Sequence, residues 1–267
     1  MEGNAKEKGK QDDGTTEQNQ TEKEPGTERP DERPVGRYPL TRKLPRVPVT
    51  PDGGELTELP QLPSTLNGIR RSAKLTLTPT RTLAGEMKEI RFGDSAARQR
   101  YALKSANREA DKIKPIETLL ARSLATFRLT NASISNLEQT ELPFVFNYSL
   151  VAENYAKSAG GLLLVRPRIV GNKSSDLLET KEPRQYPVVF EGPSQDTDTF
   201  EITLPAGYEV DDLPQPVSAE YAFASYHSKP EVSGNVLRYT RTFEIKHPSV
   251  PLSKVNDLKT LYRIIAS

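Results

Sequence analysis

The chain has 267 residues, with 37 Lys and Arg against 36 Asp and Glu, so its formal net charge is +1. This balance argues against a basic nucleic-acid-binding face and against a highly acidic, solvating protein. The chain contains no Cys, which excludes disulfide bonds, Cys-ligated metal centres and a thiol nucleophile. Hydrophobic residues make up 34% of the chain, and the length allows one large or two small domains.

The N-terminal part of the chain is poor in apolar residues. Only 8 of the first 50 residues are hydrophobic, too few to offset the entropy lost on ordering. We therefore predict a disordered polar tail over residues 1–50 and an extended, Pro-rich linker over 51–69. The tail lacks the apolar core of a signal peptide. No later stretch is long and apolar enough to be predicted as a membrane span.

From residue 70 onward, apolar and polar residues alternate. The clearest segments are 72–78, 90–92, 144–151, 199–204 and 236–246. Such alternation indicates strands with one buried face and is typical of antiparallel sheets. Gly234-Asn235 separates two of these segments and indicates a tight hairpin turn. We predict a mainly β fold over residues 70–267, an antiparallel β-sandwich that can be subdivided into 70–171 and 184–267.

Helical spacing interrupts the strand pattern in three places. Two helices are predicted at residues 95–111 and 115–127, with Pro115 in the first turn of the second helix. A third is predicted at the C-terminal end, with Ser253 as its N-cap and apolar residues on one face. The sequence thus predicts a two-helix insertion after the second strand and a C-terminal helix.

The sequence carries no motif of a nucleotide site or of a nucleophile elbow. His227 and His247 are the only two imidazoles. They fall on opposite sides of the predicted hairpin with an offset of about five residues, which separates them by about 17 Å and is too far for a shared metal ion.

Two pairs of acidic residues are close in sequence, Asp211 with Asp212 and Glu179 with Glu182. A general acid and base need different degrees of burial to separate their pKa values, and both pairs fall in polar loops. We therefore predict no catalytic residue, no cofactor-binding residue, no metal ligand and no cofactor.

Several motifs stand in a recognisable order. They are Arg184–Pro187 (RQYP), Leu204–Pro214 (LPAGYEVDDLP), Leu237–Arg241 (LRYTR) and Leu261–Ile264 (LYRI). Together they resemble the C-terminal region of bacterial transglutaminase-like proteins of the cell envelope. Upstream segments extend the resemblance to about residues 52–267; they are Leu62–Gly68, Gly93–Ala97 and Leu162–Pro167.

The resemblance implies a β-sandwich of unknown function that follows a catalytic core. That core needs a Cys nucleophile, a His base and an Asp that orients the His. Because this chain has no Cys, no catalytic residue carries over. The resemblance therefore implies a non-catalytic accessory module that acts in structure, docking or substrate presentation.

Two functions remain open at this point. The accessory module would dock on a transglutaminase-like or protease core, or on another envelope protein. The alternative is a free-standing domain of the cell envelope that binds a peptide or a glycan. No nucleic-acid partner is expected. The resemblance implies a periplasmic or envelope location, whereas the absence of a signal peptide leaves a cytoplasmic one open.

Deleting residues 1–50 is expected to leave the melting temperature unchanged, because the tail offers little apolar surface to pack on the fold. Calorimetry of the full and shortened chains measures this. A loss of more than a few degrees would show that the tail is docked, since about 1 kcal/mol shifts the melting temperature of a mid-sized domain by roughly 2–4 °C.

Overall fold

The structure, a computed structural model, describes residues 62–172 and 184–266 and the backbone of four short strands between residues 45 and 58. Of the predicted tail (1–50), the structure describes only the backbone of residues 45–46 and 49–50, and of the predicted linker (51–69) it describes residues 53–54, 57–58 and 62–69. The short strands pair antiparallel, β1 with β4 and β2 with β3. Their bounds are Pro45–Arg46 (β1), Val49–Thr50 (β2), Gly53–Gly54 (β3) and Thr57–Glu58 (β4).

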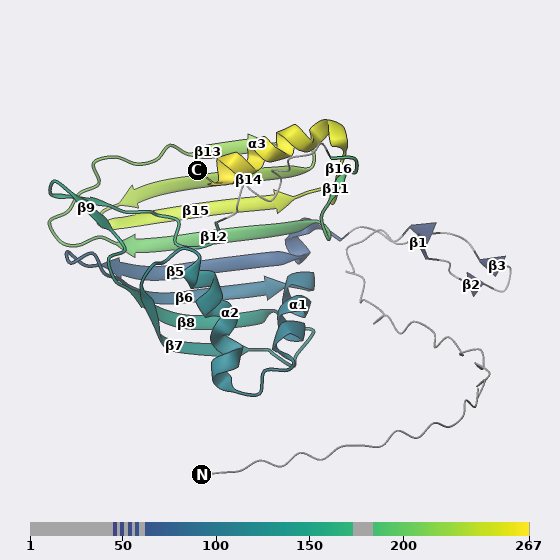
Figure 1. The fold of residues 1–267 in the computed structure, drawn as a ribbon, viewed down its shortest axis with the longest axis horizontal. Coiled ribbons are helices and arrows are strands. Elements are labelled where there is room, and N and C mark those ends of the chain that lie inside the picture. The colour runs from purple at the N-terminus through teal and green to yellow at the C-terminus, as the bar shows by residue number, and fades with distance from the viewer. Residues whose placement is uncertain are drawn as a thin grey trace, which may run out of the picture. The chain divides into compact units, whose positions relative to one another are not determined.

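One large sheet organises the described residues (Figure 1). It has eight strands in the order β13-β14-β15-β12-β5-β6-β8-β7. All neighbours are antiparallel except β5 and β12, which are parallel. The bounds are Gly68–Leu77 (β5), Leu83–Phe92 (β6), Phe127–Ser135 (β7), Phe144–Ala152 (β8), Ser194–Thr203 (β12), Val217–Glu220 (β13), Ala224–Ser233 (β14) and Val236–Ile245 (β15).

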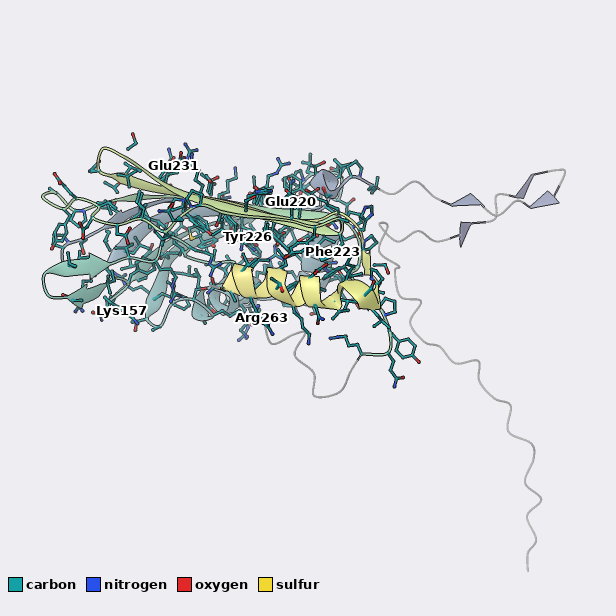
Figure 2. The ribbon with its side chains drawn as sticks, turned by 90° about the horizontal axis from the view of Figure 1, so that it is seen from above. Lys157, Glu220, Phe223, Tyr226, Glu231 and Arg263 are labelled. Atoms are coloured by element: carbon teal, nitrogen blue, oxygen red, sulfur yellow. The ribbon has the colours of Figure 1, made fainter. Side chains whose placement is uncertain are left out.

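Helices cover one face of this sheet. Figure 2 views the sheet edge-on, with α3 on one side of it. The helices are α1 (Gly93–Leu103), α2 (Glu109–Ala121) and α3 (Val255–Ala266), with 3-10 turns η1 (Ser64–Leu66) and η3 (Leu252–Lys254). Two further strand pairs are β9 (Lys157–Ala159) with β10 (Leu162–Leu164), and β11 (Val188–Val189) with β16 (Ser249–Val250).

The predicted mainly β architecture is confirmed, with two helices after the second strand of the large sheet and a helix at the C-terminal end. The layer that covers the sheet consists of helices and loops, where a sandwich would have a second sheet, and one strand pair is parallel. Alternation shows that one face of a strand is buried, but it does not show which element covers that face. The Gly234-Asn235 turn joins β14 to β15 as predicted.

The helix boundaries differ from the prediction. The second helix, α2, begins at Glu109 and ends at Ala121, so Pro115 lies inside it and Phe127 opens β7. The predicted first-turn position of Pro115 is therefore wrong, because a preference for the helix start does not exclude Pro from later turns. Ser253 lies within η3 and does not cap α3.

The covered face holds two hydrophobic clusters. The larger one lies under α1 and α2 and takes buried residues from both parts of the chain, among them Leu75, Phe146 and Phe200. The smaller one joins α3 to the β14–β15 side through residues such as Phe243 and Leu258. Strands from residues 70–171 and from 184–267 thus share the first cluster.

A buried row of charges crosses the covered face. Glu89, Arg71, Asp198 and Arg241 stand directly opposite one another on β6, β5, β12 and β15. Arg71 Nε is 2.6 Å from a Glu89 oxygen and its Nη1 is 3.1 Å from Asp198 Oδ1, while Arg241 Nη2 is 2.7 Å from Asp198 Oδ2. Burial alone would lower the pKa of Arg71, but Glu89 and Asp198 raise it above its usual value.

Gly171 lies against Arg241 and Asp198. The Arg241 Nη1 group donates a hydrogen bond of 2.5 Å to the carbonyl of Gly171. Gly171 has a φ of +85°, and a Cβ there would lie 2.9 Å from Arg241 Nη2 and 3.0 Å from Asp198 Oδ2. A side chain at this position would therefore displace the charged row.

Asp198→Asn is expected to destabilise the fold by about 3–5 kcal/mol, because it leaves Arg71 and Arg241 buried without their shared counter-ion. Glu201→Gln on the same strand is the matched control, since its ion pair with Arg238 is longer, at 3.8 Å, and partly exposed. The control is expected to change stability by less than about 1 kcal/mol. Urea unfolding of both variants measures the difference, and equal effects would contradict a structural role for the charged row.

Candidate functional site

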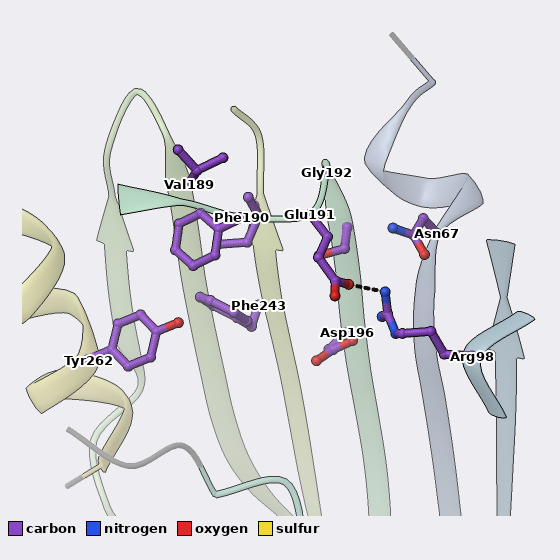
Figure 3. Close-up of a pocket in the computed structure, with 11 residues that line it drawn as sticks. Asn67, Arg98, Val189, Phe190, Glu191, Gly192, Asp196, Phe243 and Tyr262 are labelled. Atoms are coloured by element: carbon purple, nitrogen blue, oxygen red, sulfur yellow. Dashed lines mark hydrogen bonds and ion pairs between the residues drawn. The ribbon is translucent and has the colours of Figure 1, made fainter. Parts of the chain in front are cut away.

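A hollow of about 310 Å³ lies at the end of the sheet where β5 and β12 begin and β15 ends (Figure 3). Its walls come from segments far apart in the sequence. These are the residue before β5, helix α1, the segment from β11 into β12, the end of β15, and α3. The hollow therefore exists only when the strands of both parts of the sheet have assembled.

Asn67, which lines the hollow, connects the start of β5 to β12 and to helix α1. This buried side chain donates through Nδ2 to the carbonyl of Pro193 at 3.0 Å and accepts through Oδ1 from the backbone N–H of Ser95 at 3.3 Å. It thereby joins the start of β5 to the start of β12 and to α1. The next residue, Gly68, has a φ of +140°, and a Cβ there would lie 2.0 Å from the carbonyl oxygen of Gln195, so only glycine fits.

Three aromatic rings form the apolar side of the hollow. Figure 3 shows Phe190, Phe243 and Tyr262 on the same side of it. The rings of Phe243 and Tyr262 meet edge to face, with centroids 6.3 Å apart. The backbone N–H of Phe190 donates to the carbonyl of Pro248 at 2.7 Å, which holds its segment against the end of β15.

The polar side of the hollow carries charged groups. Arg98 on α1 forms an ion pair with Glu191, and both side chains are more than half exposed. Asp196 on β12 lies opposite the rings (Figure 3). Burial raises the pKa of the Tyr262 hydroxyl, and the negative charge of Asp196 raises it further.

The lining of the hollow combines aromatic rings with hydroxyl and carboxylate groups. The residues lining the hollow include Ser194 and Tyr262 as hydroxyl groups but no histidine. A hydroxyl nucleophile needs an adjacent base within hydrogen-bond reach. The hollow offers aromatic surface with polar groups at its rim, which is typical of a site that receives an apolar or aromatic group.

Neither histidine is among the residues that line this hollow. His227 is exposed on β14, with Nε2 2.7 Å from a Glu220 oxygen and Nδ1 3.1 Å from the Ser218 hydroxyl. His247 follows β15, and its backbone N–H donates to the carbonyl of Phe223 at 3.2 Å. Among the described residues, no group of three or more His, Asp or Glu could hold a metal ion.

The acidic pairs also lie elsewhere. Asp211 and Asp212 are exposed beside Tyr208 at a second, more open hollow of about 660 Å³ near the β14–β15 turn. Glu179 and Glu182 lie outside the described residues. The hollow with the aromatic rings was missed at the sequence level, because nothing in the spacing of Asn67, Arg98 and Tyr262 shows that the fold brings them together.

A family model described as a domain of unknown function with a solved structure, DUF3858, matches residues 162–267. The match covers β10 through α3 and therefore the aromatic side of the hollow, whereas Asn67 and Arg98 lie outside it. Neither the curated proteins nor the solved structures include a match to the chain. Within the described residues, no helix is long and apolar enough to cross a membrane.

Asn67→Ala is expected to cost about 1–3 kcal/mol, because it removes two hydrogen bonds from a buried junction and leaves the carbonyl of Pro193 and the N–H of Ser95 without that partner. Ser72→Ala is the matched control, since Ser72 is exposed on β5, the strand that follows Asn67. Denaturant unfolding measures both. If Asn67→Ala proved as stable as the control, Asn67 would not be the group that holds this end together.

Proposed function

We propose that this chain is a non-catalytic accessory module that docks on another protein or domain through the end of the sheet that carries the aromatic hollow. The observation that supports this most directly is a set of large apolar side chains exposed at this end. They are Leu62, Leu66, Val189 and Leu252, with exposed fractions of 41%, 55%, 59% and 44%. Large apolar groups that gather on one part of a surface mark interaction sites.

Chain connections bring these residues to the same end. Leu66 closes η1 immediately before β5, while Val189 lies on β11 and lines the hollow. Leu252 follows β16, which pairs with β11. A partner that covered these groups would also cover the mouth of the hollow, so that one of its apolar or aromatic side chains could enter between the rings.

The partner class rests on the sequence motifs. Their resemblance favours a transglutaminase-like or protease core, or another protein of the cell envelope, and hence a periplasmic or envelope location. The match to a domain of unknown function over residues 162–267 is compatible with an accessory role and names no activity. Docking at the hollow is the part of the proposal that is argued from the structure.

A comparative capture experiment tests the docking surface. Val189→Glu places a charge at the mouth of the hollow and is expected to abolish capture of any partner that the unaltered chain retains from envelope fractions. Val232→Glu is the matched control, because Val232 is also an exposed valine but lies at the far end of the sheet, next to the β14–β15 turn. A partner lost equally with both variants, or retained by both, would contradict docking at the hollow.

The same preparation tests the non-catalytic part of the proposal. The purified chain is expected to show no amine-transfer, peptidase or esterase activity, because the chain has no Cys nucleophile and no histidine lines the hollow. Assays with generic amine, peptide and ester substrates measure this. Turnover that a single substitution abolishes would overturn the assignment.

A further inference from the structure

One edge of the large sheet is open. Strand β7 has nine residues and pairs with β8 alone, so one side of its backbone has no strand partner among the described residues. The opposite edge is formed by β13, which has only four residues. Unpaired backbone N–H and C=O groups along a long edge strand are a template for another strand.

The hydrophobic core is also incomplete at this edge. Ala132 and Ile134 on β7 are only partly buried, whereas Tyr148 and Phe146, which stand opposite them on β8, are 3% and 1% exposed. Helix α2 packs over β7, and in the view of Figure 1 one end of it reaches past the strand. A strand added to β7 would lie beneath this end of α2 and continue the buried layer.

Strand β7 has few of the features that usually prevent an edge strand from pairing with another strand. Strand β7 contains no Pro and no Lys. A bulge between Leu129 and Asn131 interrupts its pairing with β8, and the pairing is regular from Asn131 to Ser135. Its one charged residue, Arg128, is exposed and forms no ion pair with any residue that the structure describes. Natural sheets more often protect such an edge with charge, Pro or a covering element.

We propose that β7 binds an extended segment of a partner protein as an added strand of the sheet. The bound segment carries apolar side chains at alternate positions, facing the α2 layer, and polar side chains on the open face. Carboxylates among those polar side chains complement Arg128. Main-chain hydrogen bonds supply the affinity, and the alternating side chains supply the specificity.

This site is independent of the docking surface proposed above. It depends on the edge of β7 and on Arg128, and it uses none of the residues that line the aromatic hollow. Val189→Glu is therefore expected to leave strand addition unchanged, so that failure of one proposal is distinguishable from failure of the other.

The test uses the full chain and two fluorescent peptide probes, Val-Glu-Val-Thr-Val-Glu-Val and its counterpart with Lys in place of Glu. Fluorescence polarisation is expected to show tighter binding of the Glu peptide, by about two- to fivefold for one cross-strand ion pair. Arg128→Glu is expected to reverse this preference. Lys88→Glu, at an exposed position on the interior strand β6, is the matched control and is expected to leave it unchanged.

Two further measurements test whether the peptide binds as an added strand at β7. A Glu peptide that is N-methylated at alternate residues keeps its side chains but loses main-chain donors, and is expected not to bind. Hydrogen exchange with the unmodified peptide is expected to slow at residues 127–135 and not at β13. Absence of binding at millimolar peptide, protection elsewhere, or a preference that Arg128→Glu leaves unchanged would each overturn strand addition at β7.

Discussion

The described fold depends on one carboxylate that two arginines share. Asp198 lies on β12 between Arg71 on β5 and Arg241 on β15, with distances of 3.1 Å and 2.7 Å to the two guanidinium groups. Because β5 and β12 form the parallel pair, this contact joins the strands that come from the two parts of the chain. Burial makes each of these charges costly without its partners, so a sheet in which these strands were not neighbours would leave a buried charge unpaired.

The aromatic hollow follows from the same pairing. With β5 beside β12, Asn67 reaches the carbonyl of Pro193, and α1 brings Arg98 to Glu191. The residues matched by the family model contribute Phe190, Phe243 and Tyr262, but the opposite wall belongs to the preceding part of the chain. The site is therefore a property of the complete sheet. A fragment limited to the matched residues would lack one wall of it.

The sequence predicted well what depends on local pattern. Alternation located most strands of the large sheet, Gly234-Asn235 marked the β14–β15 turn, and the spacing of Leu258, Leu261 and Ile265 marked α3. What it missed depends on distant contacts. Nothing local shows that β5 lies parallel to β12, that helices replace a second sheet, or that Arg98 meets Glu191 across 93 positions of the sequence. The aromatic hollow also depends on distant contacts, because none of the segments that form its walls carries a sequence pattern that indicates a site.

The parallel pair also has a consequence for how the protein is made. Strand β5 is synthesised long before β12, its neighbour, and Arg71 meets Glu89 on β6 before Asp198 exists. During translation β5 is therefore the open edge of a partial sheet, and within the charged row Arg71 has Glu89 as its partner until Asp198 is made. Until β12 is in place, that edge is open to pairing with a strand of another chain.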